Sequence, residues 1–214
     1  MNPISRHRAI FLAYFGMIAL LLLTSLFSPG FLSGSHLRSM TVLAAFIGIV
    51  ALGQTFVIIG AGIDLSIPWV LNCAAILMSL MAGGENQPLL WAIPIVLLAG
   101  MAVGAINGVG VAVFGVPPII MTLAVNVILQ GSILVYTGGA PPTAAPGLIQ
   151  FLAVGRIGPF PVVAFIWLAL ATAATIALSK TAFGRQLYAV GSNATVAEFS
   201  GVPITRTIIL TYVI

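Results

Sequence analysis

Long apolar runs fill most of this sequence and constrain its fold more than any other feature. A helix needs about 20 apolar residues to cross the hydrocarbon core of a bilayer. Seven runs are apparent: Ala9–Phe27, about Ser39–Gly60, about Ile67–Ala82, Leu89–Phe114, Ile119–Tyr136, Val162–Ser179 and the shorter Thr207–Ile214. Only 5% of the residues are charged, against about 25% in soluble domains. The sequence therefore predicts an all-α integral membrane protein, a polytopic helical bundle with six complete spans plus the start of a seventh, and it excludes a soluble enzyme.

The seventh run is too short to cross a bilayer. We therefore expect residues 1–214 to form a single transmembrane domain that is truncated at its C-terminal end. The first run follows basic residues, as a signal peptide would, but the segment Thr24–Gly30 offers no A-x-A cleavage site. We interpret the first run as an uncleaved span.

Basic residues are distributed unevenly between the connecting segments. If the N-terminus lies in the cytoplasm, the inside segments contain Arg6, Arg8, Lys180, Arg185 and Arg206, and the outside segments contain only Arg38 and Arg156. Basic loops favour the cytoplasm. The asymmetry therefore predicts a cytoplasmic N-terminus, with segment 180–206 inside and segments 83–88 and 137–161 outside. A re-entrant turn near Asp64, in place of a connection, would change this parity.

Asp64 is the only acidic residue in the first three runs. It lies in Gly60-Ala-Gly-Ile-Asp-Leu-Ser66, just before Pro68. A carboxylate at the membrane centre costs about 2.5–3.5 kcal/mol. The glycines and the proline predict a break between two spans, where Asp64 caps the third span by accepting from the amide of Ser66 or Ile67. A direct role in solute passage for Asp64 and Ser66 is the alternative.

Polar side chains also interrupt the apolar helices. Thr122, Asn126 and Gln130 recur every four residues and form one stripe on the fifth span. Each should face the protein interior, where it either hydrogen-bonds to another helix or lines a path for solute. Asn72 and Asn107 are isolated polar residues for which contact between helices is expected. Asn72 is also a candidate for the solute path.

Small residues recur on the fourth span. Gly100, Gly104 and Gly108 are spaced four residues apart. This pattern is typical of a helix face that another helix backbone approaches closely. It predicts helix packing and carries no information about solute.

Several functional classes lack their motifs in this sequence. There is no G-x-x-x-x-G-K-[ST] sequence for binding ATP and no cluster of His and Glu with metal-ligand spacing. The basic residues are scattered, which argues against nucleic-acid binding. We therefore expect no catalysis by this chain, no bound metal and no cofactor.

The segment 180–206 is the most polar part of the chain. Asn193 is suited to cap a helix, and Thr195 with Glu198 offers an alternative capping box. Gly201 followed by Pro203 is suited to end it. The segment therefore predicts a short helix of about two turns, or else an ordinary ordered loop.

Three blocks of the chain form an ordered pattern. They are Gly62-Ile-Asp-Leu-Ser66, the stretch from Asn107 through Gly115-Val-Pro-Pro118 to Tyr136-Thr-Gly-Gly139, and the stretch from Thr181-Ala-Phe-Gly-Arg185 to Ser200-Gly201. Together they resemble the permease subunits of bacterial ABC importers of the ribose, xylose and galactose type. Permeases for branched-chain amino acids share the layout but match the first block less well. The chain departs from the family pattern at Ile67-Pro68-Trp69 and at Gln130, so the resemblance does not specify the sugar.

The resemblance implies an ABC importer permease fold in the bacterial inner membrane and a set of partners. These are cytoplasmic ATP-binding subunits, a second permease copy or related chain, and a periplasmic substrate-binding protein. It also implies that segment 180–206 docks on the ATP-binding subunit. The residues that we expect to act in this coupling are Arg185, Tyr188, Asn193, Glu198, Phe199 and Gly201.

Other functions remain open from the sequence alone. The solute is a monosaccharide in the favoured interpretation, or a branched-chain amino acid or another small polar solute. A secondary transporter or channel would account for the polar stripe but not for segment 180–206. A membrane fragment that does not transport is the remaining alternative.

Overall fold

The computed structural model describes residues 3–28, 30–140 and 144–214. The chain divides into two compact units, Met1–Ala44 and Ala45–Ile214. The first unit contains α1 (Pro3–Phe27) and the start of α2 (Gly34–Ile59). The second unit contains the rest of α2 and all the elements that form the candidate site.

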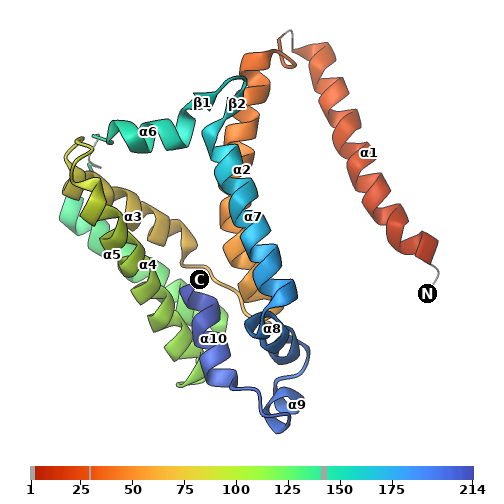
Figure 1. Ribbon diagram of the computed structural model, residues 1–214, viewed down its shortest axis with the longest axis vertical. Helices are drawn as coiled ribbons and strands as arrows, with labels where there is room; N and C mark the ends of the chain where they lie inside the picture. Colours follow the sequence, from red (N-terminus) through yellow and green to blue (C-terminus); the bar gives the residue numbers. More distant parts are fainter. Residues whose placement is uncertain (1–2, 29, 141–143) are drawn as a thin grey trace. The chain divides into compact units, whose positions relative to one another are not determined.

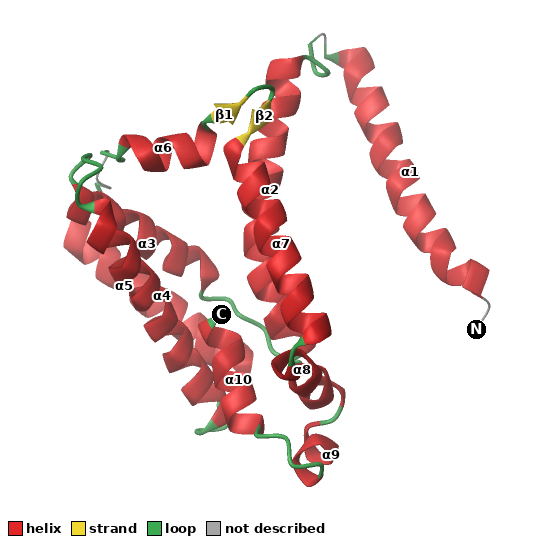
Figure 2. Cartoon of the chain, viewed as in Figure 1, coloured by secondary structure: helices red, strands yellow, loops and turns green. Residues whose placement is uncertain are grey.

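The second unit is almost entirely helical (Figure 2). After α2 the elements are α3 (Ile67–Ala82), α4 (Leu89–Ala112), α5 (Pro118–Thr137), α6 (Gly147–Val154), β1 (Arg156–Ile157), β2 (Phe160–Pro161), α7 (Val162–Lys180), α8 (Ala182–Ser192), α9 (Ala194–Phe199) and α10 (Ile204–Val213). The two short strands form an antiparallel hairpin in which Ile157 pairs with Phe160. The predicted all-α class is confirmed.

Four helices in the described residues are long and apolar enough to cross a membrane, namely α2, α4, α5 and α7. Three other apolar helical stretches in the described residues are shorter, namely Phe11–Phe27 in α1, α3 with 16 residues and α10 with 10. At 1.5 Å per residue α3 is about 24 Å long, less than the roughly 30 Å of a hydrocarbon core. The predicted number of six complete spans therefore stays a prediction.

Helices α3, α4 and α5 pack against one another, and α10 packs on α4 and α8 (Figure 1). The connection between α2 and α3 leads from the α8 end of the unit back into this group (Figure 1). It joins two separate helices, α2 and α3.

Two segments contain helices or strands that were not predicted from the sequence. Segment 137–161 holds α6 and the hairpin, and segment 180–206 holds α8 in addition to the predicted short helix. Side chains hold α6 in place, because Asn86 Oδ1 accepts from Leu148 N at 2.9 Å and Ser79 Oγ donates to Ala144 O at 2.5 Å. The short apolar helix α6 was not predicted from the sequence because Gly and Pro residues flank it.

Candidate functional site

The break between α2 and α3 begins with a tight turn. Helix α2 ends where the amide of Ala61 donates to Ile58 O at 3.0 Å and the amide of Gly62 donates to Val57 O at 2.8 Å. This is the Schellman pattern, which needs a left-handed residue just after the helix. That residue is Ala61, with φ of 59°. The interruption was expected, but its positive φ lies on the alanine between the two glycines. We call residues Gly60–Ser66 the break segment.

Asp64 organises the second half of the break segment. Its Oδ1 accepts from Ser66 N at 2.7 Å and from Ser66 Oγ at 2.6 Å. The predicted bond from the amide of Ser66 is confirmed, but the cap position of α3 is Ser66 itself and not Asp64. Asp64 thus fixes the turn that leads into α3.

Three helices contact the break segment through polar side chains. From α4, Asn107 Nδ2 donates to Ser66 Oγ at 2.9 Å. From α5, Thr122 Oγ1 accepts from Leu65 N at 3.0 Å and donates to Pro118 O at 2.8 Å. From α10, Tyr212 Oη donates to Ile63 O at 3.4 Å. The side chains of Asn107 and Thr122 are fully buried.

This burial changes the interpretation of two predicted solute contacts. Ser66 and Thr122 are 1% and 0% exposed, so neither reaches an open path in this conformation. Their polar groups are satisfied by the break segment and by neighbouring helices. Asp64 is half-buried in the same network.

The other three predicted path residues lie outside this network. Asn72 is exposed, and its Nδ2 donates to Pro68 O at 2.8 Å within its own helix. Asn126 and Gln130 are half-buried on α5. The Oδ1 atom of Asn126 is buried and has no hydrogen-bond partner among the described residues. In the stripe on α5, Thr122 is therefore a structural residue, whereas Asn126 and Gln130 have carboxamide groups that can form further hydrogen bonds.

Backbone contacts bring α10 against α4. A Cβ atom at Gly104 would collide with the carbonyl of Tyr212, and one at Gly108 would lie 2.7 Å from the Cα of Ile209. At Gly100 no atom of a neighbouring element lies within 4 Å of the Cβ position, so its predicted packing role is not seen among the described residues. The close approach is confined to the second half of α4.

Helix α8 lies against the end of α2. Phe183 stacks on Phe56 with ring centroids 6.3 Å apart. One turn later comes Leu187, which is fully buried. A Cβ atom at Gly60 would lie 3.0 Å from its side chain. Another turn on, Gly191 lies so close to Ile59 O that a Cβ would not fit. The spacing of Phe183, Leu187 and Gly191 is the signal in the sequence that could have revealed this amphipathic helix.

Helix α9 has well-defined ends and an exposed surface. Asn193 Oδ1 accepts from Val196 N at 3.1 Å, so the predicted cap is confirmed and the alternative box of Thr195 with Glu198 is not used. At the other end Gly201 has φ of 80°, and its amide donates to Glu198 O at 2.9 Å. Phe199 is 89% exposed. Four of the larger exposed side chains on α8 and α9 are Arg185, Tyr188, Glu198 and Phe199, and we call them the α8–α9 surface.

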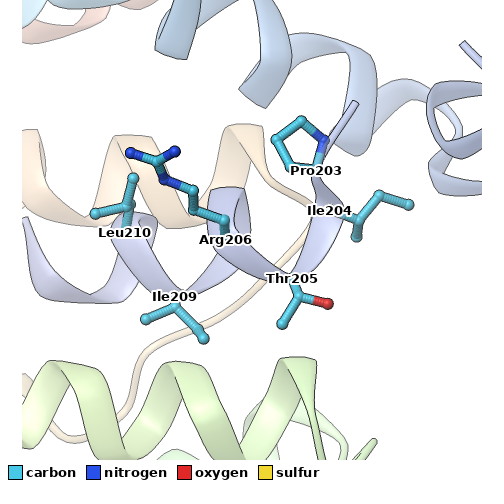
Figure 3. Close-up of a pocket in the computed structure, with 6 residues that line it drawn as sticks. All are labelled: Pro203, Ile204, Thr205, Arg206, Ile209 and Leu210. Atoms are coloured by element: carbon cyan, nitrogen blue, oxygen red, sulfur yellow. The ribbon is translucent and has the colours of Figure 1, made fainter. Parts of the chain in front are cut away.

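An open hollow borders the first turns of α10 (Figure 3). In this view Arg206 and Leu210 extend on one side of the helix, and Thr205 and Ile209 extend on the other. None of the predicted path residues lines this hollow. Among the described residues no three His, Cys, Asp or Glu side chains come together as a metal site would require.

The sequence has relatives of known type. The profile of a family described as "Branched-chain amino acid transport system / permease component" matches residues 37–214. The chain is 34% identical over 202 residues to the ribose import permease protein RbsC of Bacillus subtilis, covering 93% of this chain and 62% of the relative. It is 32% identical over 198 residues to RbsC of Haemophilus influenzae, with 91% and 61% covered.

A further relative imports a different compound. The chain is 31% identical over 174 residues to the autoinducer 2 import system permease protein LsrD of Photorhabdus laumondii, covering 78% of this chain and 51% of the relative. The chain thus spans less than two thirds of the length of these proteins. No solved structure matches it.

Proposed function

The chain belongs to the permease family of branched-chain amino acid transport systems, and on this premise we propose that it is the membrane-spanning subunit of an ABC importer for a monosaccharide. Its similarity to ribose import permeases over more than 90% of its length supports this class of solute. Similarity to an autoinducer 2 import system permease supports the role of importer subunit. In this proposal ATP is bound and hydrolysed by a partner.

The α8–α9 surface is the observation that carries this proposal. A helix of six residues is not stable alone in water, yet α9 is capped at both ends and presents Phe199 almost fully to solvent. Exposed aromatic side chains on a rigid element commonly anchor protein interfaces. We propose that the cytoplasmic ATP-binding subunit covers this surface. Asn193 and Gly201 then fix the ends of α9, while Arg185, Tyr188, Glu198 and Phe199 meet the partner.

The proposed arrangement in the inner membrane has the N-terminus in the cytoplasm and six complete spans, namely α1, α2, α3, α4, α5 and α7. The α8–α9 surface is then cytoplasmic, whereas α6 and the hairpin face the periplasm, where the substrate-binding protein docks. The α3 helix crosses with the help of the break segment. A second permease copy or a related chain completes the path, and single-domain organisation over residues 1–214 is part of the proposal.

We propose that solute passes the polar residues of α3 and α5 that retain free hydrogen-bonding capacity. Asn126 and Gln130 supply carboxamide groups suited to sugar hydroxyls, and Asn72 is exposed on α3. Asp64, Ser66 and Thr122 shape the wall of this path from behind, because the described conformation buries or pairs their polar atoms.

Uptake into proteoliposomes tests the proposal. The complete protein is reconstituted with its ATP-binding and substrate-binding partners, and labelled ribose is supplied outside the vesicles with ATP enclosed. We expect accumulation that requires hydrolysable ATP and both partners. Accumulation by the permease without ATP would favour a secondary transporter or a channel.

A further inference from the structure

The break segment has contacts on both sides that the proposed function does not use. We propose that Gly60–Ser66 transmits movement from α8 and α10 to the membrane-spanning helices, with Thr122, Asn107 and Tyr212 as its positioning residues. This inference rests on the proposed function, since it assigns a route by which a partner at the α8–α9 surface acts on the transport path.

One end of the break segment rests on α8. The closest approach is between Gly191 and the carbonyl of Ile59, where there is no space for a side chain. Leu187 fills the space beside Gly60. A shift of α8 along this contact has to displace the end of α2, because a tightly packed interface does not deform continuously.

The middle of the break segment rests on α10. A Cβ at Gly62 would lie 2.8 Å from Tyr212 Oη and 3.1 Å from Val57 Cγ1. The same tyrosine donates to Ile63 O. Helices α8 and α10 are the neighbours of α9 in the chain. Both helices that flank the proposed docking element therefore touch the break segment directly.

The far end of the break segment is held by the core helices. Thr122 on α5 accepts from Leu65 N, and Asn107 on α4 donates to Ser66 Oγ. These two bonds join residues 57 and 41 positions apart in the sequence. They connect α4 and α5 to a segment that lacks the regular hydrogen bonds of a helix, so movement of the segment reaches both helices.

The turn at Ala61 makes the break segment suited to change its conformation. Ala61 has a left-handed backbone, which is unfavourable for a residue with a Cβ. Such conformations persist only where surrounding contacts hold them, and they gather at elements that switch. In this structure the turn is held by the bonds to Ile58 and Val57 and by contact with α8 and Tyr212.

A hydroxyl deletion at Thr122 tests the inference. Thr122→Val keeps the shape of the side chain but leaves the amide of Leu65 without its acceptor, and Thr122→Ser keeps the acceptor. Thr172→Val on α7 is the matched control, because within the described part of the chain the exposed Thr172 side chain bonds only to Leu168 O in its own helix. The complete transporter is assayed with ribose for uptake KM and Vmax, for substrate-stimulated ATP hydrolysis and for retention of the ATP-binding subunit.

We expect Thr122→Val to lower Vmax and stimulated hydrolysis by about 3- to 10-fold, the range for one hydrogen bond. KM and retention of the ATP-binding subunit should not change, and Thr122→Ser and Thr172→Val should behave as the wild type. If Thr122→Val does not insert, Tyr212→Phe supplies the same comparison through the bond to Ile63.

Three results would overturn the inference. An active wild type with unchanged Vmax in Thr122→Val would remove the break segment from the coupling route. A raised KM at unchanged Vmax would assign Thr122 to solute binding instead. Equal losses in Thr122→Val, Thr122→Ser and Thr172→Val would indicate general sensitivity of the fold. A wild-type complex without ATP-dependent uptake would instead overturn the proposed function, and this inference with it.

Discussion

Buried polar residues in this chain serve mainly to hold an irregular piece of backbone. A backbone segment that leaves helical geometry inside a membrane protein needs partners for its amides and carbonyls. Asp64 and Thr122 supply acceptors to the amides of Ser66 and Leu65, and Tyr212 supplies a donor to the carbonyl of Ile63. The break is therefore a specific structure, and single residues in it have predictable effects.

Replacing Ala61 by glycine should stabilise the protein. A left-handed backbone costs an L-residue roughly 1–2 kcal/mol, and glycine removes this cost. Glycine also loses more backbone entropy on folding, which offsets about 0.5–1 kcal/mol of the gain. We expect Ala61→Gly to raise the melting temperature of the purified protein. Ala124→Gly, at an exposed helical position on α5, should lower it. A lower melting temperature in Ala61→Gly would show that the turn is not strained.

Removing the cap of α9 should fray that helix without affecting the spans. Asn193→Ala deletes the acceptor for Val196 N, a change that costs about 0.5–2 kcal/mol. Hydrogen exchange at the amides of α9 should become faster, whereas Asn193→Asp should retain protection. Unchanged protection in Asn193→Ala would mean that contacts with neighbouring elements, and not the cap, hold the helix.

Hydrogen bonds between residues close together in the sequence were predictable, and contacts between residues far apart in the sequence were not. The bond from Ser66 N to Asp64 joins residues two apart, and the cap at Asn193 acts within one turn. The role of Asn107 depends on the register of α4 against the break segment, which residue spacing within a single helix does not specify. The left-handed residue was ambiguous because Gly60, Ala61 and Gly62 offered three positions for it.

At the scale of elements, the pairing of α4 with α10 determines how the C-terminal part of the unit packs. Gly104 and Gly108 allow the two backbones to meet, and this contact also places Tyr212 beside the break segment. The four-residue spacing of the glycines indicated such a face. It did not identify α10 as the partner, nor did it show that Gly100 faces open space.

Substitution of two glycines on α4 separates these roles. Gly104→Leu should disrupt assembly, because a side chain there meets the backbone of Tyr212, and overpacking costs typically about 1–3 kcal/mol. Gly100→Leu is the matched control and should be tolerated. Membrane abundance and thermal stability of the two variants are the measurements. Normal values for Gly104→Leu would contradict the observed contact.

Helix α8 was not predicted from the sequence, although its apolar residues recur with helical spacing. The segment was interpreted through its caps at Asn193 and Gly201, which define α9. Thr181 caps α8 as well, since its side chain accepts from Gly184 N at 3.1 Å. The face formed by Phe183 and Leu187 packs against the end of α2. The sequence alone did not show that the end of α2 lies beside it.

At the scale of the whole molecule, the two ends of the second unit differ in character. One end carries α6 and the hairpin, and the other carries α8, α9 and the first part of the break segment (Figure 1). The all-α class that the sequence predicts is confirmed, and the six alternating crossings stay a prediction. The charge asymmetry of the connecting segments predicts which of these two ends faces the cytoplasm.

Labelling of single cysteines tests the sidedness. In a Cys73→Ser background, cysteines at Ser5 and Arg156 should react from opposite sides of the membrane, with Arg156→Cys accessible from the periplasm. The measurement is modification by an impermeant maleimide in intact cells and in inverted vesicles. Reaction of both positions from the periplasm would overturn the proposed topology.

The proposed transport function depends on an ATP-binding partner that covers the α8–α9 surface. The most direct measurement is photo-crosslinking in the assembled complex, with a benzoylphenylalanine residue in place of Phe199, which is 89% exposed. Phe160, which is 60% exposed on the hairpin, is the matched control position for the same substitution. We expect an adduct with the ATP-binding subunit from position 199 and none from position 160. An adduct of position 199 only with this chain or with lipid would contradict this expectation.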